Sequence, residues 1–387
     1  APKITPIVTN RDSQSEFLSE IQTSQVQPIE PVFVDYKKDM SQFEAQPGID
    51  VLYKKNETND IFTLIYVFNT GTENDPALNL AFNYLSYLGT DKMTAEEIAS
   101  EMYDIACSFY MNAGANQSSI QITGLSENMG KAMEIVEGLI AGAKPDEAIL
   151  ENCKADMLKS RADAKLNQSR CFGALQRYLF YGGDFIRRTT LTDPALQALT
   201  SEQLLAKIGG LMGKQHEVLY YGPQKEAEVK SALAEHHKVA TDLQPLEKKF
   251  STLLPTDANK VVLAQYDAKQ LYYLQFSNRG EKFDVAADPE ITLYNEYFGG
   301  GMNTIVFQEM REARGLAYTA WATLATPSNA NGDYSYYAFI ATQNDKMQKA
   351  VEAFDDIINN MPESEKAFGI AKEALVSRLR TERTVKD

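Results

Sequence analysis

YFGGGMNTIVFQEMREARGLAY, residues 297–318, is the stretch that decides most about how this chain folds. The glycines at 299–301 predict a turn, because glycine adopts positive φ and lets another stretch of chain come close. Asn303 or Thr304 can begin a helix after this turn, and Gly315 can end it. The residues after Gly315, LAYTAWATL, are typical of a strand. The stretch therefore predicts a glycine turn, a helix and a strand in succession.

Arg311 lies near the end of the predicted helix, and Tyr318 lies seven residues further along. Two interpretations of this pair are open from the residues alone. The first is structural: a cation is favoured at a helix C-terminus, and Tyr318 is an aromatic residue of the core. The second is functional: a guanidinium and a phenol hydroxyl both donate hydrogen bonds, and both suit the carbonyl oxygens of a peptide.

This stretch resembles a motif of the M16 peptidases, the inverzincin family of insulin-degrading enzyme, pitrilysin and mitochondrial processing peptidase. In the non-catalytic half of those enzymes, an Arg and a Tyr at this same spacing follow a Gly-rich turn. They contact the substrate beside a zinc ion that the other half holds. Arg311 and Tyr318 follow Gly299, Gly300 and Gly301 here. The resemblance therefore implies a substrate-binding role for these residues and favours the functional interpretation.

The family's catalytic half carries H-x-x-E-H shortly before a Gly-Thr pair, and a further glutamate completes the zinc site. Counting back from Gly89 in this chain puts Leu80 and Tyr84 at the histidine positions and Asn83 at the glutamate position. Leucine offers no ligand atom, asparagine is a poor base, and tyrosine is an uncommon zinc ligand. The third ligand falls near 159–161, where Lys-Ser-Arg is cationic. We therefore expect no metal site and no catalytic residue in this chain, and we expect zinc in a partner half.

The remaining histidines and cysteines offer no alternative site. His216 begins a predicted strand and is interpreted as a structural residue. His236 and His237 are neighbours near the end of a predicted helix, so we expect their side chains to diverge into solvent. The cysteines lack a C-x-x-C pair and form neither a disulfide framework nor a thiolate metal site. They are Cys107, Cys153 and Cys171.

The predicted fold class is α+β, with two duplicated M16-type domains in which helices cover one side of an antiparallel-rich sheet. The order of strands and helices predicted for residues 48–245 recurs in residues 255–387. Nothing in the second domain matches residues 169–245, so we expect that domain to be incomplete. Residues 1–47 are polar and are expected to form a connector or hinge arm. The predicted strands occupy 50–53, 61–68, 107–112, 119–123 and 217–221, and then 261–265, 271–276, 317–324 and 334–340.

The composition is that of a globular protein, with 53 acidic against 38 basic residues and a net charge of −15. An acidic surface repels phosphate groups, so we expect no nucleic-acid partner. No apolar run approaches the roughly 18 residues that a membrane span needs. The polar composition and the habits of the family imply a bacterial periplasmic location. Because the chain begins with Ala-Pro and its repeat is lopsided, we expect a fragment of a longer protease.

Taken together, the resemblance implies the non-catalytic half of an M16 zinc metalloendopeptidase, inactive alone, that forms one wall of a closed peptide chamber. Its partners would be an extended peptide substrate and a catalytic half, carried by the same longer chain or by a separate subunit. An alternative is a catalytically inert partner or scaffold subunit of a heteromeric M16 complex. A third hypothesis is a binding module that holds extended peptides without any partner.

Overall fold

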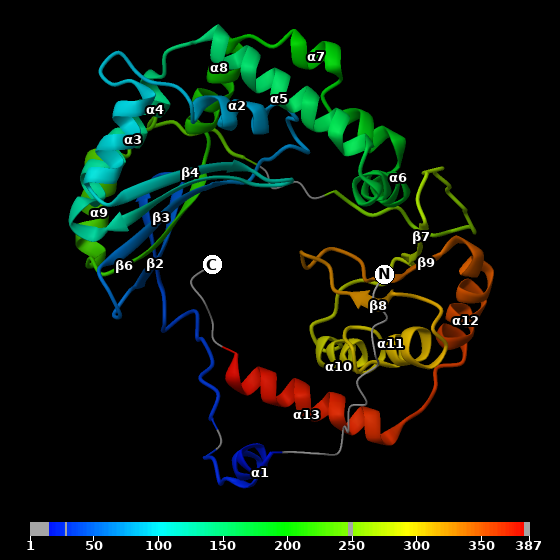
Figure 1. The fold of residues 1–387 in the computed structure, drawn as a ribbon. Coiled ribbons are helices and arrows are strands. Elements are labelled where there is room, and N and C mark those ends of the chain that lie inside the picture. The colour runs from blue at the N-terminus through cyan, green and yellow to red at the C-terminus, as the bar shows by residue number, and fades with distance from the viewer. Residues whose placement is uncertain (1–14, 28, 247–250, 383–387) are drawn as a thin grey trace.

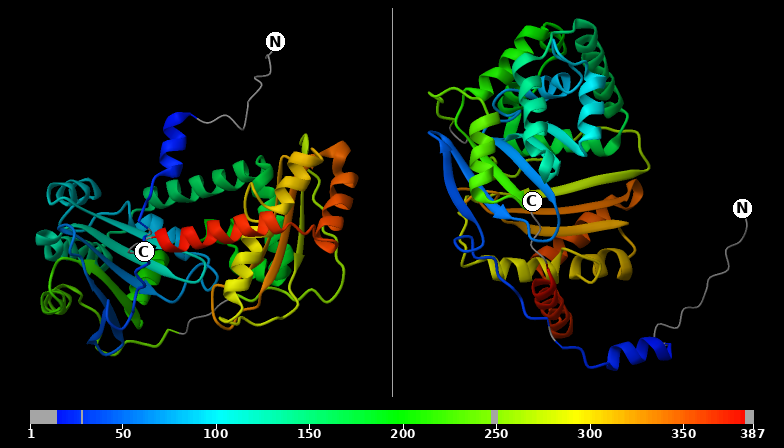
Figure 2. Two further views of the ribbon diagram at one scale, coloured as in Figure 1. Left: turned by 90° about the horizontal axis from the view of Figure 1, so that it is seen from below. Right: turned by 90° about the vertical axis from the view of Figure 1, so that its left-hand side faces the viewer.

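The computed structural model describes residues 15–27, 29–246 and 251–382, and Figures 1 and 2 show how they are arranged. Two β-sheets lie in successive parts of the chain, and each has helices packed on one face. The fold is therefore mixed α and β, as the sequence predicts. Among the described residues, no helix is both long enough and apolar enough to cross a membrane.

The first sheet has the spatial strand order β1-β2-β6-β3-β5-β4. Neighbouring strands are antiparallel except β2 and β6, which are parallel. The sequence of β3, IFTLIYVF, is almost continuously buried, as expected of a strand inside the sheet. The strands are β1 (Ser41–Gln46), β2 (Ile49–Lys55), β3 (Ile61–Phe68), β4 (Cys107–Ala113), β5 (Ser118–Leu125) and β6 (His216–Gly222).

The arm before this sheet is shorter than predicted. Residues 41–46, expected to belong to a polar connector, form β1 and pair with β2. Their alternation of half-buried and exposed side chains matches an edge strand that covers the core on one face only. The helix α1 (Glu16–Thr23) lies in the arm and buries none of its residues.

The helices on the first sheet share one apolar core with it. α3 begins at the capping box that the sequence predicts. The N–H of Glu97 donates to the Thr94 hydroxyl at 3.2 Å, and the N–H of Thr94 donates to the Glu97 carboxylate at 2.7 Å. The helices are α2 (Leu78–Leu85), α3 (Ala95–Asp104), α4 (Met129–Gly142), α5 (Glu147–Lys165), α6 (Gln168–Thr189), α7 (Asp193–Gln197), α8 (Ser201–Met212) and α9 (Glu226–His236).

The second sheet is antiparallel and has the order β7-β9-β8 within the described residues. Its core lies between one face of the sheet and the helices of this part of the chain. We call residues 41–246 the first unit and residues 251–382 the second unit. The elements of the second unit are β7 (Gln270–Ser277), α10 (Asp288–Phe298), α11 (Ile305–Phe307), η2 (Gln308–Ala313), β8 (Thr319–Ala325), β9 (Ser335–Gln343), α12 (Met347–Asn359) and α13 (Glu365–Thr381).

The duplication is visible in the strand order. β3, β4 and β5 correspond to β7, β8 and β9, because in both sheets the first of these strands pairs with the third and the third pairs with the second. The predicted strand at 261–265 is wrong, since these residues form no strand. In the first sheet, β2 pairs with β6 and not with β3, and the described residues of the second unit contain no counterpart of β6. Residues 261–265 therefore lack the strand with which they would pair.

α6 reaches from the first unit to the second sheet (Figure 1). It bends at Gly182, where φ is +80°. The ring centroids of Phe172 and Tyr272 lie 5.5 Å apart, and those of Phe180 and Phe276 lie 4.6 Å apart. These contacts join a helix from the range predicted for the first domain to the strand that opens the second sheet.

Candidate functional site

The glycine turn at 299–301 follows α10 and lies against β8. Gly299 is buried, and a Cβ atom there would collide with the backbone of Ala322. The N–H of Ala322 donates to the carbonyl oxygen of Gly299 at 3.3 Å. The sequence predicts that another stretch of chain comes close to the glycine turn. That stretch is β8 of this same chain. The expectation of positive φ is wrong for all three glycines, and only Gly300 and Gly301 are exposed.

The helix after the turn is short and irregular. α11 passes directly into η2, a π-helix that carries Arg311. Met310 is fully buried, and its carbonyl oxygen accepts from the N–H of Leu316 at 2.9 Å. Gly315 follows the π-helix with a φ of +57°, which confirms its predicted role in ending the helix. π-helices are rare and frequently occur at functional sites.

Arg311 and Tyr318 lie side by side on the surface of the second unit. The guanidinium carbon of Arg311 is 4.9 Å from the ring centroid of Tyr318 and 5.0 Å from that of Phe307. A cation above aromatic rings is attracted to them, so the two rings hold the guanidinium in place. Tyr318 exposes 69% of its surface, and its interpretation as a core residue is therefore wrong. Its backbone is fixed to β9 by a 3.1 Å hydrogen bond from its N–H to the carbonyl of Ala341.

Both side chains retain hydrogen-bond donors. The hydroxyl of Tyr318 bonds to none of the described residues. The Arg311 side chain is 40% exposed, and its Nε lies 3.6 Å from Oε1 of Glu312, an exposed pair that contributes little. The pair can therefore donate to oxygens of a bound molecule. Phe307 is absent from the predicted site, although its spacing of four residues from Arg311 on a helix could have indicated the contact.

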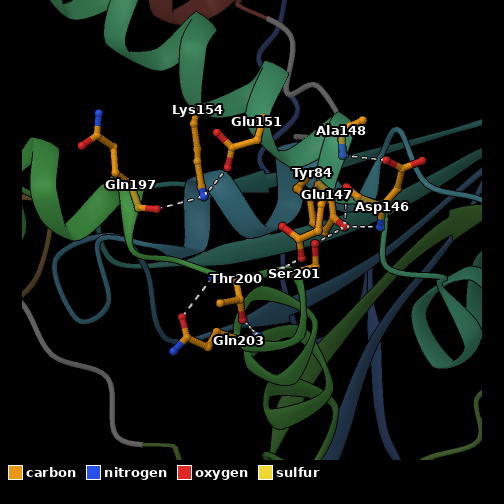
Figure 3. Close-up of polar contacts among 10 residues, drawn as sticks. All are labelled: Tyr84, Asp146, Glu147, Ala148, Glu151, Lys154, Gln197, Thr200, Ser201 and Gln203. Carbon is orange, nitrogen blue, oxygen red and sulfur yellow. Dashed lines mark hydrogen bonds and ion pairs between the residues drawn. The ribbon is translucent and has the colours of Figure 1, made fainter.

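Tyr84, at one of the histidine positions of the zinc motif, is a buried structural residue (Figure 3). Its hydroxyl accepts from the N–H of Asp146 at 2.7 Å and donates to Oγ of Ser201 at 2.8 Å. It thereby joins α2 to the beginnings of α5 and α8. Leu80 is buried in the apolar core, whereas Asn83 is exposed. Leu80 and Tyr84 do not fit a zinc ion. The Tyr84 hydroxyl is the only side-chain oxygen of these two buried residues, and it already bonds to Asp146 and Ser201.

The region expected to supply the third zinc ligand is equally unsuited. Arg161 pairs with Asp193. Lys154, earlier on α5, is buried and donates to Oε1 of Glu151 at 2.8 Å and to the carbonyl of Gln197 at 3.1 Å (Figure 3). In the part of the chain that the structure describes, no group of three or more His, Cys, Asp or Glu side chains converges as metal ligands would.

His216 and His237 form a buried pair. This corrects the expectation that the side chain of His237 lies in solvent. Its Nε2 is 2.9 Å from Nε2 of His216, and its Nδ1 is 2.5 Å from Oε1 of Glu137. Nδ1 of His216 lies 2.8 Å from the carbonyl of Lys214, which requires a proton on that nitrogen. The proton between the two rings therefore comes from His237. Burial lowers the pKa of His216 to about 4, so it stays neutral and is a structural residue.

Two surface hollows of the described residues include neither Arg311 nor Tyr318 in their lining. One is lined by α3, β4 and β5 and includes Tyr103. Another lies between α13 and the arm, where Val26 and Ile29 face Val376. The Arg311–Tyr318 pair therefore lies on an open surface. A second surface facing the pair would be needed to enclose a bound molecule.

Comparison with known proteins relates this chain to a family of peptidases. The family model described as "Peptidase M16 inactive domain" matches residues 215–375. An uncharacterized zinc protease of Streptomyces coelicolor is 22% identical over 266 residues, which cover 64% of this chain and 56% of that protein. The chain is similar to M16 zinc proteases. The part that matches is the inactive domain of that family.

Solved structures of M16 proteins share this fold. The M16 inactive domain from Pseudomonas fluorescens superposes with a TM-score of 0.68 at 17% identity, covering 89% of this chain and 85% of that one. The periplasmic protease PqqL from Escherichia coli superposes with a TM-score of 0.70 at 13% identity, covering 98% of this chain and 43% of PqqL. The chain therefore spans about half the length of the Streptomyces relative and less than half of PqqL.

Proposed function

We propose that this chain forms the non-catalytic wall of the peptide chamber of a zinc metalloendopeptidase, and that Arg311 and Tyr318 bind carbonyl oxygens of the substrate there. The observation that carries the proposal is the exposed pair itself, with the guanidinium 4.9 Å from the phenol ring and with donors left over on both. The zinc would lie in a catalytic partner half, because Leu80 and Tyr84 of this chain cannot hold it.

The chemistry of the pair suits an extended peptide. A guanidinium offers several N–H donors in a fixed plane, and a phenol offers one O–H donor. The rings of Phe307 and Tyr318 fix the direction of the guanidinium before the substrate arrives. Inside a chamber that excludes water, such donors stabilise the negative charge that develops on a carbonyl oxygen during cleavage. The exposed Gly301, with no atom within 4 Å of its would-be Cβ, leaves open space at the glycine turn.

The names of the relatives support the same class of reaction and a location. The Streptomyces relative is named a zinc protease, and PqqL is described as a periplasmic protease. We extend both to this chain as part of the proposal, with a bacterial periplasm as its location. Fractionation of the source cells, followed by detection of the chain with an antibody, tests the location directly.

The test of the substrate contacts uses this chain assembled with its zinc-bearing half. Arg311→Lys and Tyr318→Phe are each expected to lower kcat/KM on an extended peptide by about 10²-fold, the typical loss on removing one such donor. Zinc content and melting temperature should stay at the wild-type values, because both side chains lie on the surface.

Matched controls separate a substrate contact from a general surface effect. Arg314→Lys changes a neighbouring arginine that pairs with Glu309 and Asp356, and Tyr103→Phe changes an exposed tyrosine of the first unit. Both controls should keep wild-type kinetics. Wild-type kinetics in Arg311→Lys and Tyr318→Phe as well would remove the proposed contacts. An assembly that holds no peptidase activity at all would favour the alternative of an inert scaffold subunit.

A further inference from the structure

A chain of three hydrogen bonds runs through the core of the first unit. It starts at the carbonyl of Lys214 and passes through the ring of His216. It continues through the ring of His237 and ends at the carboxylate of Glu137. Both histidines are buried, and the side chain of Glu137 is only 12% exposed. We call His216, His237 and Glu137 the histidine cluster; it joins the start of β6 to the end of α9 and to α4.

The three links fix the number of protons in the histidine cluster. A carbonyl oxygen only accepts, so the link to Lys214 needs a proton on Nδ1 of His216. The 2.9 Å link between the two rings holds one proton, and the link from His237 to Glu137 holds one more. Two imidazoles and one carboxylate with three protons carry no net charge. The cluster is therefore bonded at every link and electrically neutral, which lowers the cost of burying it.

A fourth proton has no suitable place in the histidine cluster. On Nε2 of His216 it would set two N–H groups against each other across 2.9 Å. On Glu137 it would leave a buried imidazolium without its counter-charge. Tyr66 faces the rings from β3, with its ring centroid 4.2 Å from that of His237. Burial and the nearby Glu137 raise the pKa of this phenol well above its usual range, so it supplies no negative charge.

The residues from His237 onward lead from the first unit toward the second. We call residues 237–246 the connecting segment. The N–H of Gln215 donates to the carbonyl of Gln244 at 2.9 Å, and the N–H of Gln244 donates to the carbonyl of Gly213 at 3.0 Å. Leu243 is buried in the core. The strand β6 beside this segment pairs along its length with β2 on one side and β3 on the other. The connecting segment is therefore held less firmly than β6, and such segments open first.

We propose that the histidine cluster is an acid-sensitive latch, which holds the connecting segment beside β6 at neutral pH and releases it when a fourth proton enters. Release moves His237 away from His216, so that each ring carries its own charge in water. β6 stays in its sheet, because β2 and β3 still hold it. The aromatic contacts between α6 and β7 do not include the cluster, so the two units stay joined there. The latch thus controls one of the connections between the units.

The size of the effect follows from His216. In the folded chain burial holds its pKa at about 4, against 6.5 for an ordinary histidine. Release returns the ring to water and restores the ordinary value. The released state therefore binds a proton that the closed state does not bind between these two pH values. The equilibrium constant for release should rise on the order of 10²-fold as the pH falls from 7.5 to 4.

Amide hydrogen exchange of the 387-residue chain at pH 7.5 and pH 4, resolved to single residues, tests the latch. Dividing the intrinsic exchange rate at each pH by the measured rate gives a protection factor. Gln215 and Gln244 are the reporter amides, because their N–H groups hold the connecting segment. Their protection factors should fall by about 10²-fold from pH 7.5 to pH 4. The amides of β3 should stay at least about tenfold better protected than the reporters at both pH values, because release is local.

Two variants assign the effect to the histidine cluster. His216→Gln has no imidazole at this position, and its amide can offer either an N–H or an oxygen to His237. The protection factors of the reporter amides should then change by less than about threefold between the two pH values. His236→Gln is the matched control, because His236 lies against Gly130 and 3.9 Å from Glu235, outside the cluster. It should keep the wild-type pH dependence.

The wild-type comparison decides the proposal even if His216→Gln fails to fold. A change of less than about threefold at the wild-type reporter amides would show that no latch opens. The proposal is equally wrong if the reporters are protected as well as β3 at pH 4, because the first unit would then open only as a whole. It is also wrong if folded His216→Gln keeps the wild-type pH dependence, or if His236→Gln removes it. These outcomes are independent of the proposed substrate contacts at Arg311 and Tyr318.

Discussion

Replacing Tyr84 by Phe tests whether this buried tyrosine joins α2 to the beginnings of α5 and α8. The substitution keeps the buried ring and removes a hydroxyl that accepts from the N–H of Asp146 at 2.7 Å and donates to Oγ of Ser201 at 2.8 Å. Each of these hydrogen bonds contributes about 1 kcal/mol to stability. Ser201 is fully buried, and leaving its hydroxyl without this partner costs up to about 1 kcal/mol more. The free energy of unfolding should therefore fall by about 2–3 kcal/mol.

Urea denaturation and calorimetry measure this loss. In a unit of this size, a destabilisation of 2–3 kcal/mol corresponds to a decrease in melting temperature of about 4–12 °C. Tyr87→Phe is the matched control, because Tyr87 lies three residues away and is 55% exposed. It should change the free energy of unfolding by less than about 0.5 kcal/mol. Equal, small effects of both substitutions would refute the assignment of Tyr84 as the residue that joins α2, α5 and α8.

Further predictions concern the buried histidine and the glycines. The pKa of His216 is lowered from 6.5 to about 4 in the folded chain. Between these pH values the unfolded chain therefore binds a proton at His216, whereas the folded chain does not. The free energy of unfolding should fall by up to about 3 kcal/mol between pH 6.5 and pH 4 in urea titrations, and a His216→Gln variant with the same slope would contradict this. Gly299→Ala should destabilise the second unit by about 1–3 kcal/mol, because its methyl group meets the backbone of β8, whereas Gly301→Ala should be nearly neutral. Equal melting temperatures for these two variants would show that the close approach at Gly299 is unimportant. Gly315→Ala, at a φ of +57°, should cost about 1 kcal/mol in denaturant unfolding, and no loss would argue against the left-handed helix end.

Features that depend on neighbours in the sequence could be predicted. The capping box at Thr94 needs only the residue three positions later, and the run of β-branched and aromatic residues in β3 specifies a buried strand by itself. Thr304 does precede the first helical residue as predicted, but its hydroxyl donates to the carbonyl of Gly301 and caps no helical N–H. The absence of zinc ligands at Leu80, Asn83 and Tyr84 stays a prediction that rests on spacing and residue type.

Features that depend on distant partners could not be predicted. The segment 261–265 has the composition of a strand, but a strand also needs a partner, and β6 has no counterpart in the described part of the second unit. His237 is adjacent to His236 in sequence, yet it is buried and contacts Glu137 and His216, which belong to other elements. Periodicity does not reveal the π-helix at η2, in which Met310 is buried. The exposure of Tyr318 was likewise undecided from composition, since an aromatic residue before a strand fits a core equally well.

Photochemical cross-linking from residue 318 tests the central claim most directly. In the assembled enzyme, Tyr318 is replaced by the photoreactive residue p-benzoylphenylalanine, and the enzyme is illuminated with an extended peptide substrate. The same replacement at Tyr103, an exposed tyrosine of the first unit, is the control. A covalent adduct with the peptide is expected from position 318 and none from position 103. No adduct from position 318, or equal adducts from both positions, would contradict a role of this surface in holding the substrate.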